Sequence, residues 1–151
     1  VKNVSNEVIG NIKVRYSKLK CIDIKGDIIP SLIDELPILF IACAAASGTS
    51  KISGIEELRY KESDRIMAME NGLKAIGINV QSSKDSIEIT GGDITGGRVN
   101  SYDDHRIAMS FAVAGLISQY SLTIMDTQNI STSFPTFVTI LRELGVEVFE
   151  V

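Results

Sequence analysis

The sequence predicts an α/β protein in which one arrangement of strands and helices occurs twice. Segments of alternating polar and apolar residues, typical of strands, are interspersed with Ala-rich or amphipathic segments typical of helices. Similar features recur about 70 residues apart in three pairs of positions: Asp34 and Asp104, Ile52 and Ile124, and Gly77 and Gly145. A repeat of this length indicates stacked supersecondary units, because each unit alone is small for a hydrophobic core.

The composition is typical of a globular domain. Of the 151 residues, 44% are hydrophobic and 23% are charged, and the formal net charge is -4. An acidic chain without a run of Lys and Arg is not expected to bind nucleic acid or acidic membranes, although a small anion can bind in a local basic pocket. The longest apolar run, from Leu36 to Ala46, is too short to span a bilayer.

The cysteine and histidine content argues against disulfides and metal sites. Cys21 and Cys43 lie far apart in the sequence, and His105 is the only histidine. This pattern predicts reduced thiols and no zinc site. The first residues lack the apolar core of a signal peptide, so a cytoplasmic location is expected.

The first half of the chain starts with two expected strands and a helix. Residues 12–16 and 19–24 alternate and carry β-branched residues, which favours strands. Residues 36–46 are apolar and too many for a buried strand, so a helix is expected. Pro37 fits its first turn, and Asp34 is a candidate cap.

A further strand, a helix and a hairpin complete the first half. A strand is expected over 49–54, and a helix over 63–76 that ends at Gly77. The apolar stripe of this helix consists of Ile66, Met69, Leu73 and Ile76. Residues 78–82 and 86–90 favour two strands joined by a tight turn.

The second half repeats this order with fewer strands. We expect a strand over 97–102, a helix capped by Asp104 that runs to about 118, a strand over 121–126, a helix over 135–144 and a strand over 146–151.

The repeat suggests boundaries within one partial domain, residues 1–151. Residues 1–10 are interpreted as the end of a preceding unit, residues 11–92 as the first repeat unit and residues 93–151 as the second. The Gly-rich stretch GGDITGGR at 91–98 marks the seam between the two units. We therefore expect the chain to be part of a longer protein.

Three cations lie where a helix dipole disfavours them. Lys61 and Arg65 flank the expected start of the helix over 63–76, and Arg106 follows Asp104 by two residues. A helix N-terminus carries roughly half a positive charge, so cations at this position need a counter-ion.

Two explanations are open for these cations. They can form surface ion pairs with Glu62, Asp64 and Asp103, which contribute about 0–1 kcal/mol each. Alternatively, a phosphate or carboxylate ligand binds at both helix ends, where free N–H groups, the dipole and the guanidinium groups act on the same oxygens. The recurrence at related repeat positions favours the ligand.

Three further residues near these helix ends are candidates for proton transfer. Asp34 can serve as a helix cap or as a general base. Glu62 can be a solvated surface residue or a proton donor. His105 can be a hydrogen-bonding residue at the helix end or a group near the same anion.

Four stretches of the sequence resemble the 5-enolpyruvylshikimate-3-phosphate (EPSP) synthase family, whose members are also called 3-phosphoshikimate 1-carboxyvinyltransferases. They are PSLIDELPILFIACAAASGTS, ISGIEELRYKESDRI, YDDHRIAMSFAVAGL and STSFPTFVTILRELGVEV. The resemblance extends from about Ser17 onward, and the combination of KESDR with DHRIAM is highly specific. It implies the enolpyruvyl-transferase fold, an inside-out α/β barrel of βαβαββ units, with about two of the three units of the C-terminal domain present and the N-terminal domain missing.

The resemblance also implies an activity and its partners. Members of the family transfer the enolpyruvyl group of phosphoenolpyruvate to the 5-hydroxyl of shikimate 3-phosphate and release phosphate, a step of aromatic amino acid biosynthesis. No cofactor or metal is implied, since cations neutralise the phosphate. The full-length enzyme is expected to be a monomer, and this chain alone to be inactive, because closure of two domains assembles the site.

The functional residues of the family can be carried over to matching positions. Asp34 corresponds to the base at the sugar hydroxyl, Lys61 to a contact with shikimate 3-phosphate and the reacting centre, and Glu62 to the proton donor to the methylene carbon. Arg65 and Arg106 correspond to the arginines that bind phosphoenolpyruvate.

Three other positions qualify the resemblance. His105 corresponds to a neighbour that orients the reacting groups. Thr132 stands where many members carry Lys, and Glu57 where others carry an Asn that contacts the phosphate of shikimate. The glyphosate-tolerant subgroup shares the Thr and also resembles the stretch EELRYKESDR.

Two other functions are considered. The sister family that transfers enolpyruvyl to UDP-N-acetylglucosamine shares the fold but differs at both motifs. A non-catalytic repeat module whose basic helix ends bind surface anions is the third possibility, and it predicts no phosphate affinity tighter than millimolar.

Overall fold

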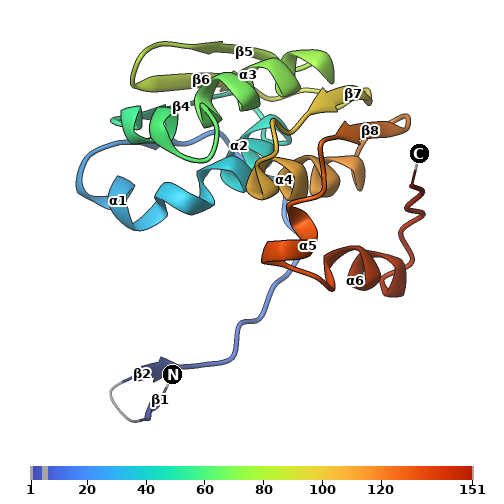
Figure 1. The fold of residues 1–151 in the computed structure, drawn as a ribbon. Helices are drawn as coiled ribbons and strands as arrows, with labels where there is room; N and C mark the ends of the chain where they lie inside the picture. The colour runs from blue at the N-terminus through green and yellow to red at the C-terminus, as the bar shows by residue number, and fades with distance from the viewer. Residues whose placement is uncertain (1, 5–6, 151) are drawn as a thin grey trace.

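The computed structural model describes residues 2–4 and 7–150. Its larger sheet is mixed and has four strands, of which β4, β5 and β6 are labelled in Figure 1. In spatial order the strands are β3 (Asp23–Ile24), β4 (Thr49–Ser53), β6 (Ser86–Thr90) and β5 (Asn79–Ser82). The first pair is parallel and the other two pairs are antiparallel. Ile52 lies opposite Ile87 and Val80 opposite Ile89, so each strand turns its apolar residues toward the helices.

A second, two-stranded sheet repeats the parallel part of the first. β7 (Gly97–Asn100) runs parallel to β8 (Leu122–Met125), and α4 (His105–Gly115) connects them. In the same way α2 (Leu36–Ala44) lies on the connection between β3 and β4. The strand–helix–strand unit therefore occurs twice, as the repeat in the sequence predicts.

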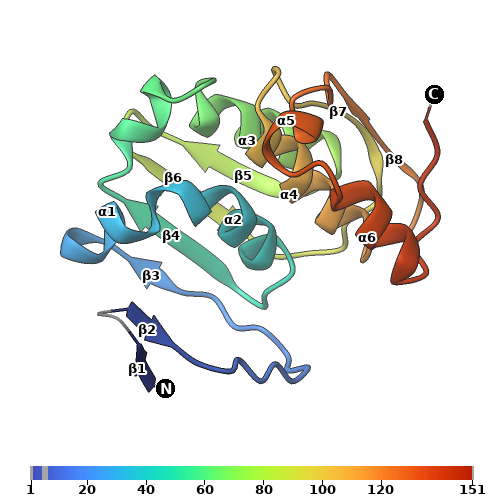
Figure 2. The same cartoon turned by 60° about the horizontal axis from the view of Figure 1, so that its bottom comes forward.

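Three helices pack against one another beside the sheets. Figure 2 shows α2, α3 (Arg65–Ala75) and α4 gathered at the centre of the molecule. Their contacts are formed by apolar side chains with no exposed surface, among them Phe40, Met69, Leu73 and Phe111. Burial of α2 follows from its sequence, because it is apolar on every face and has no polar stripe for solvent.

Gly72 permits a close approach of α3 to α4. A β-carbon at this position would collide with the ring of Phe111. The distance between the two helices therefore depends on the absence of a side chain at residue 72.

The remaining elements are short. They are β1 (Lys2–Val4), β2 (Glu7–Ile9), α1 (Ile29–Leu32), α5 (Ile130–Ser133), α6 (Phe137–Glu143) and the 3-10 turns η1 (Gly26–Ile28), η2 (Ile33–Glu35) and η3 (Glu56–Tyr60). Within the described residues, no helix combines the length and the apolar character that crossing a bilayer requires.

Most expected elements are confirmed with shorter bounds. The helices expected over 36–46, 63–76 and 104–118 are α2, α3 and α4, and the expected hairpin is β5 with β6. The helix expected over 135–144 begins at Phe137 instead, and α5, just before it, is not predicted by the sequence pattern.

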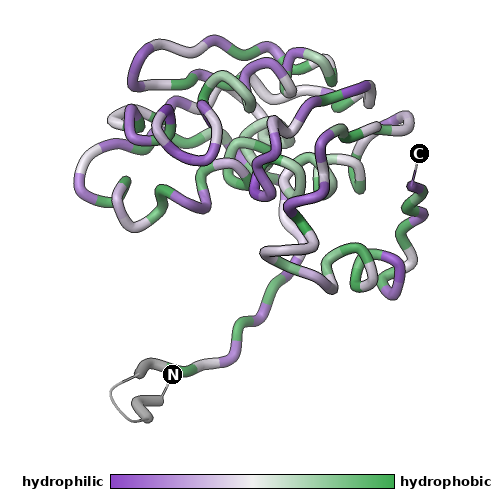
Figure 3. The backbone as a smooth tube through the Cα atoms, viewed as in Figure 1, coloured by the Kyte–Doolittle hydropathy of each residue, from purple (hydrophilic) through white to green (hydrophobic). Residues whose placement is uncertain are grey.

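Two predicted strands are wrong. Residues 12–16 form no strand, and Ile12, Val14 and Tyr16 are 91%, 86% and 92% exposed. Figure 3 shows the alternation of hydropathy along this extended segment, but no neighbouring strand pairs with it in the described part of the chain. Residues 146–150 likewise form no strand, and Val151 lies outside the described residues.

Other expectations about the N-terminal half need correction. The strand expected over 19–24 is reduced to β3 and a bridge between Lys20 and Ser47. Asp34 does not cap α2, because Glu35 occupies the cap position and no side chain caps this helix. β1 and β2 pair with each other, and the interpretation of residues 1–10 as the end of a preceding unit stays a prediction.

Candidate anion-binding site

Arg65, the first residue of α3, is bound by three carboxylates. Its Nε donates to Asp104 at 2.8 Å, Nη1 to Asp34 at 3.1 Å and Nη2 to Glu62 at 2.5 Å. The side chain is only 1% exposed. A buried guanidinium needs this degree of pairing, because an unpaired charge in the interior is strongly unfavourable.

Asp104 is the N-cap of α4 and is fully buried. Its Oδ1 accepts hydrogen bonds from the backbone N–H groups of Arg106 at 2.9 Å and Ile107 at 3.4 Å. Its Oδ2 accepts from Arg65 and, at 3.1 Å, from the hydroxyl of Ser63. The predicted cap is confirmed, and the same side chain is also a counter-ion of Arg65.

Asp64 caps α3 in a similar way. Its Oδ1 accepts from the backbone N–H of Met67 at 2.9 Å, and its Oδ2 pairs with Nη1 of Arg59 at 2.7 Å. Arg59 also donates to the carbonyl groups of Ser83 and Lys84, so it connects the start of α3 to the turn between β5 and β6.

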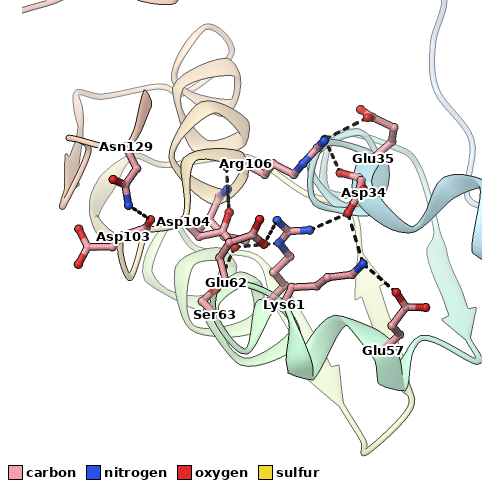
Figure 4. Close-up of polar contacts among 12 residues, drawn as sticks. Asp34, Glu35, Glu57, Lys61, Glu62, Ser63, Asp103, Asp104, Arg106 and Asn129 are labelled. Carbon is pink, nitrogen blue, oxygen red and sulfur yellow. Dashed lines mark hydrogen bonds and ion pairs between the residues drawn. The ribbon is translucent and has the colours of Figure 1, made fainter. Parts of the chain in front are cut away.

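Asp34 is the point at which the three cations converge (Figure 4). Its carboxylate pairs with Arg65 at 3.1 Å and lies 3.7 Å from Nζ of Lys61. Its backbone carbonyl accepts from Nη1 of Arg106 at 2.9 Å. The turn η2 places Asp34 in this position, away from the cap of α2 that the sequence pattern suggests.

Two further carboxylates pair with the outer cations. Glu57 lies 2.7 Å from Nζ of Lys61, and Glu35 lies 3.0 Å from Nη1 of Arg106. Both are exposed and can exchange with water or with a ligand.

The cations around Asp34 change its acidity. Partial desolvation would raise the pKa of Asp34, but the hydrogen bond from Arg65 and the charges of Lys61 and Arg106 lower that pKa below its ordinary value. Asp34 is therefore ionised at neutral pH and, while it remains bound to these cations, is a weak base.

The cations themselves remain charged. The hydrogen bond to Glu57 and the nearby charge of Asp34 raise the pKa of Lys61. Burial would lower the pKa of Arg65, but the hydrogen bond and charge of Asp104 and the charge of Glu62 raise it. Both side chains thus keep a full positive charge.

The turn before α4 has an uncommon backbone. Tyr102 and Asp103 have φ values of 55° and 57°, in the left-handed region that non-glycine residues seldom adopt. The side-chain amide of Asn129 donates to the carbonyl of Asp103, and the hydroxyl of Ser101 donates to the carbonyl of Asp126 at 2.6 Å. Figure 4 shows Asn129 pointing at this turn, so the segment before α5 supports the start of α4.

A pocket of about 220 Å³ lies beside Arg106. One edge is polar and the rest is mostly apolar. It is lined by Asp34, Glu35, Ile38, Arg106, Met109, Ser110, Val113, Phe134 and Phe137. The pocket therefore places a guanidinium and a carboxylate next to a surface that suits the carbon atoms of a small ligand.

The structure brings together five of the six predicted site residues: Asp34, Lys61, Glu62, Arg65 and Arg106. His105 lies at the start of α4, but its ring forms no hydrogen bond or ion pair with the described part of the chain. Thr132 is exposed on α5 and makes no contact with the three cations among the described interactions.

Sequence patterns do not reveal two participants of the site. The pattern identifies Asp104 only as a cap, and it gives no role to Glu35. Asp104 directly precedes the predicted site residue His105, and Glu35 directly follows Asp34. Their arginine partners are far away in sequence: Arg65 lies 39 residues from Asp104, and Arg106 lies 71 residues from Glu35. In the described residues, no group of three or more His, Cys, Asp or Glu side chains is arranged to bind a metal ion.

The fold is that of the enolpyruvyl transferases. The chain superimposes on the enolpyruvyl transferase NikO from Streptomyces tendae with a TM-score of 0.66 and 17% identity, over 87% of this chain and 30% of the other. At this identity the similarity establishes the fold alone.

Sequence comparison defines the family. The family described as EPSP synthase (3-phosphoshikimate 1-carboxyvinyltransferase) matches residues 2–141, and the chain belongs to it. EPSP synthase from Acinetobacter baumannii superimposes with a TM-score of 0.80 and 45% identity, over 83% of this chain and 30% of that protein. The 3-phosphoshikimate 1-carboxyvinyltransferase of Legionella pneumophila (strain Paris) is 48% identical over 144 residues.

The match covers only part of the relatives. It includes 95% of this chain but 33% of the Legionella protein, so the chain spans about a third of the length of its curated relatives. The family resemblance in the sequence is confirmed.

Proposed function

We propose that this chain contributes the C-terminal part of a 3-phosphoshikimate 1-carboxyvinyltransferase. The reaction transfers the enolpyruvyl group of phosphoenolpyruvate to the 5-hydroxyl of shikimate 3-phosphate and releases phosphate. The observation that supports it best is the convergence of Lys61, Arg65 and Arg106 on Asp34. The N-termini of α3 and α4 and the end of the turn η3 thereby supply positive charge to one place, next to the candidate base Asp34.

Asp34, Glu62 and Lys61 carry the proton transfers in this proposal. Asp34 accepts the proton of the 5-hydroxyl, while Glu62 donates a proton to the methylene carbon of phosphoenolpyruvate, and the new C–O bond forms at the adjacent carbon. Loss of phosphate and of a proton from the methyl group then restores the double bond. Lys61 contacts shikimate 3-phosphate and the reacting centre.

The arginines bind phosphoenolpyruvate. A planar guanidinium can bind a carboxylate or a phosphate through two parallel hydrogen bonds, which suits Arg65 and Arg106 for this role. His105 orients the neighbouring groups. Neutralisation of the phosphate by cations requires no cofactor.

Binding must rearrange the charges that the structure shows. Asp34, Glu35, Glu57, Glu62 and Asp104 pair with the three cations, so the cluster carries more negative than positive charge. A dianionic substrate therefore takes the place of exposed carboxylates at the cations. Asp34, once separated from Arg65, becomes a stronger base, because its pKa rises when the cation moves to the substrate.

A ligand titration of the chain tests the proposal. Phosphoenolpyruvate, shikimate 3-phosphate and inorganic phosphate are added separately, and the side-chain NMR signals of Arg65, Arg106 and Arg142 are followed. Arg142 is the internal control, since it pairs with Val148 and Glu150, apart from the site. We expect phosphoenolpyruvate to shift the signals of Arg65 and Arg106 but not that of Arg142, with a Kd below about 1 mM.

An absence of shifts at Arg65 and Arg106 would contradict the proposed function. Signals of Arg65 and Arg106 that do not move up to several millimolar of either phosphorylated substrate would rule out a preformed anion site and favour simple surface ion pairs. Equal shifts of all three arginines would indicate a nonspecific effect of ionic strength.

Five further proposals accompany the activity. We propose that residues 11–92 and 93–151 are two of three βαβαββ units of one domain, and that the remainder of the enzyme covers the site. We also propose a cytoplasmic, monomeric full-length enzyme. Thr132 and the stretch EELRYKESDR support membership of the glyphosate-tolerant subgroup, without implying tolerance.

A further inference from the structure

Asp104 connects the two elements that carry the candidate anion-binding arginines. Through Oδ2 it accepts from Nε of Arg65 at 2.8 Å, and through Oδ1 it accepts from the backbone N–H of Arg106 at 2.9 Å. One side chain therefore fixes both the guanidinium of Arg65 and the backbone from which Arg106 extends.

The three partners of Arg65 differ in burial. The side chains of Asp34 and Glu62 are 49% and 53% exposed, whereas that of Asp104 is fully buried. An exposed carboxylate that loses its partner is solvated by water, but a buried one is left with an uncompensated charge. A ligand can therefore replace Asp34 and Glu62 at Arg65 far more easily than it can replace Asp104.

The geometry of the guanidinium fits this division. Asp104 binds Nε, on the side of the fork that faces the interior, while Asp34 and Glu62 bind the two terminal Nη groups. With Nε held by Asp104, the two terminal groups together can form paired hydrogen bonds with a carboxylate or phosphate.

We propose that Asp104 is a positioning residue of the anion site, an inference that rests on the proposed function. Asp104 keeps Nε of Arg65 bound when phosphoenolpyruvate replaces Asp34 and Glu62, so that both Nη groups are directed at the ligand. The same carboxylate fixes the first turn of α4 and with it the origin of the Arg106 side chain.

Asp64 provides a matched control for this role. It is also the N-cap of an eleven-residue helix, and its second oxygen also pairs with an arginine, Arg59. That arginine connects to the carbonyl groups of Ser83 and Lys84 instead of the cluster around Asp34. A purely structural role for Asp104 would make the two caps equivalent in their effect on ligand binding.

The test compares Asp104→Asn with Asp64→Asn. Each amide keeps an oxygen that can accept the capping hydrogen bond and removes one negative charge. The Kd of phosphoenolpyruvate is measured by calorimetry at pH 7, and stability by urea unfolding. We expect both variants to lose stability, but Asp104→Asn to weaken phosphoenolpyruvate binding by about tenfold or more and Asp64→Asn, which leaves Nε of Arg65 bound to Asp104, by clearly less.

Each outcome has a defined meaning. Equal Kd values for the two variants would overturn the positioning role of Asp104 while leaving the proposed function intact. A wild-type chain that does not bind phosphoenolpyruvate would overturn the proposed function, and the positioning role with it.

A second measurement applies if Asp104→Asn does not fold. In the wild-type chain, the rate at which the Nε–H of Arg65 exchanges with water is measured by NMR with and without saturating phosphoenolpyruvate. We expect this exchange to stay slow in both states, because Asp104 remains bound. Exchange as fast as that of the exposed Arg142 in the presence of ligand would show that Asp104 releases Arg65, which contradicts the inference.

Discussion

Helices α3 and α4 begin in the same way but serve different purposes at their N-termini. Each has an aspartate cap whose second carboxylate oxygen pairs with an arginine: Asp64 with Arg59, and Asp104 with Arg65. Arg59 is partly exposed and ties the start of α3 to a β-turn, whereas Arg65 is buried among carboxylates of three separate segments.

The difference shows how one local motif acquires two roles. A cap stabilises a helix end wherever it occurs, by about 0.5–2 kcal/mol. The role of its second oxygen depends on the arginine that the fold brings to it. At α3 the arginine is Arg59, which also binds the turn of the β5–β6 hairpin. At α4 it is Arg65, which belongs to the cluster of cations around the candidate base Asp34.

The largest expected effect comes from removing the buried arginine. Arg65→Ala leaves the carboxylate of Asp104 buried without its cation, and we expect the free energy of unfolding to fall by about 3–5 kcal/mol. Arg59→Ala, the control, should cost only about 1 kcal/mol, since its partners can turn to water. Urea unfolding of both variants measures the difference, and similar losses would show that the two pairs are equivalent.

A change in the spacing of the two helices should have the next largest effect. Gly72→Ala forces a β-carbon into the ring of Phe111, and we expect a net loss of about 2 kcal/mol despite the better helix propensity of Ala. Gly115→Ala is the control, because its β-carbon would meet Leu122 at an ordinary 3.9 Å. Thermal unfolding that ranks the two variants in the reverse order would contradict the close approach of α3 to α4.

Substitution of Arg65 by lysine separates the contribution of the planar guanidinium group from that of the positive charge. Arg65→Lys keeps a cation but loses the planar guanidinium that binds Asp104 through Nε and presents two parallel N–H groups to a ligand. We expect the Kd of phosphoenolpyruvate to rise at least about tenfold, equivalent to about 1.4 kcal/mol. Arg59→Lys should leave this Kd unchanged. Calorimetric titration gives both values, and an unchanged Kd for Arg65→Lys would remove Arg65 from the anion site.

The smallest expected effect concerns Asp34, one of the two exposed partners of Arg65. The pKa of Asp34 is lower in the folded chain than in the unfolded one, so its ionised form stabilises the fold at pH values above the unfolded pKa of about 3.9. This contribution is lost as the pH falls through the folded pKa. We expect the wild-type chain to be more stable than Asp34→Asn at pH 6, and the difference to vanish as the pH falls through the lowered folded-state pKa of Asp34. A difference independent of pH would mean that Asp34 acts through packing alone.

Patterns within one element are sufficient to predict much of this molecule. The apolar stripe of α3, the hairpin of β5 and β6 and the cap of α4 are encoded by residues close in sequence, and each prediction is confirmed. The cations at the helix starts also predict where a candidate site lies, because Arg65 and Arg106 both occupy first-turn positions that the helix dipole disfavours.

Features that depend on distant partners cannot be predicted in this way. Residues 12–16 have the alternation of a strand but no partner in the described chain, and alternation carries no information about a partner. Asp34 resembles a cap in sequence, yet η2 directs it to Arg65, 31 residues away. The contact of Glu35 with Arg106 spans 71 residues and results from the packing of α2 against α4.

The left-handed turn at Tyr102 and Asp103 links the candidate site to the last part of the chain. Residues in this conformation are retained only where their surroundings compensate the cost, and here Asn129 and the carbonyl of Asp126 supply the compensation. A substitution at Asn129, which itself forms no ion pair with the cluster, can thus reorient the first turn of α4. The direction of the Arg106 side chain thus depends on a hydrogen bond made by a residue 23 positions further along the chain.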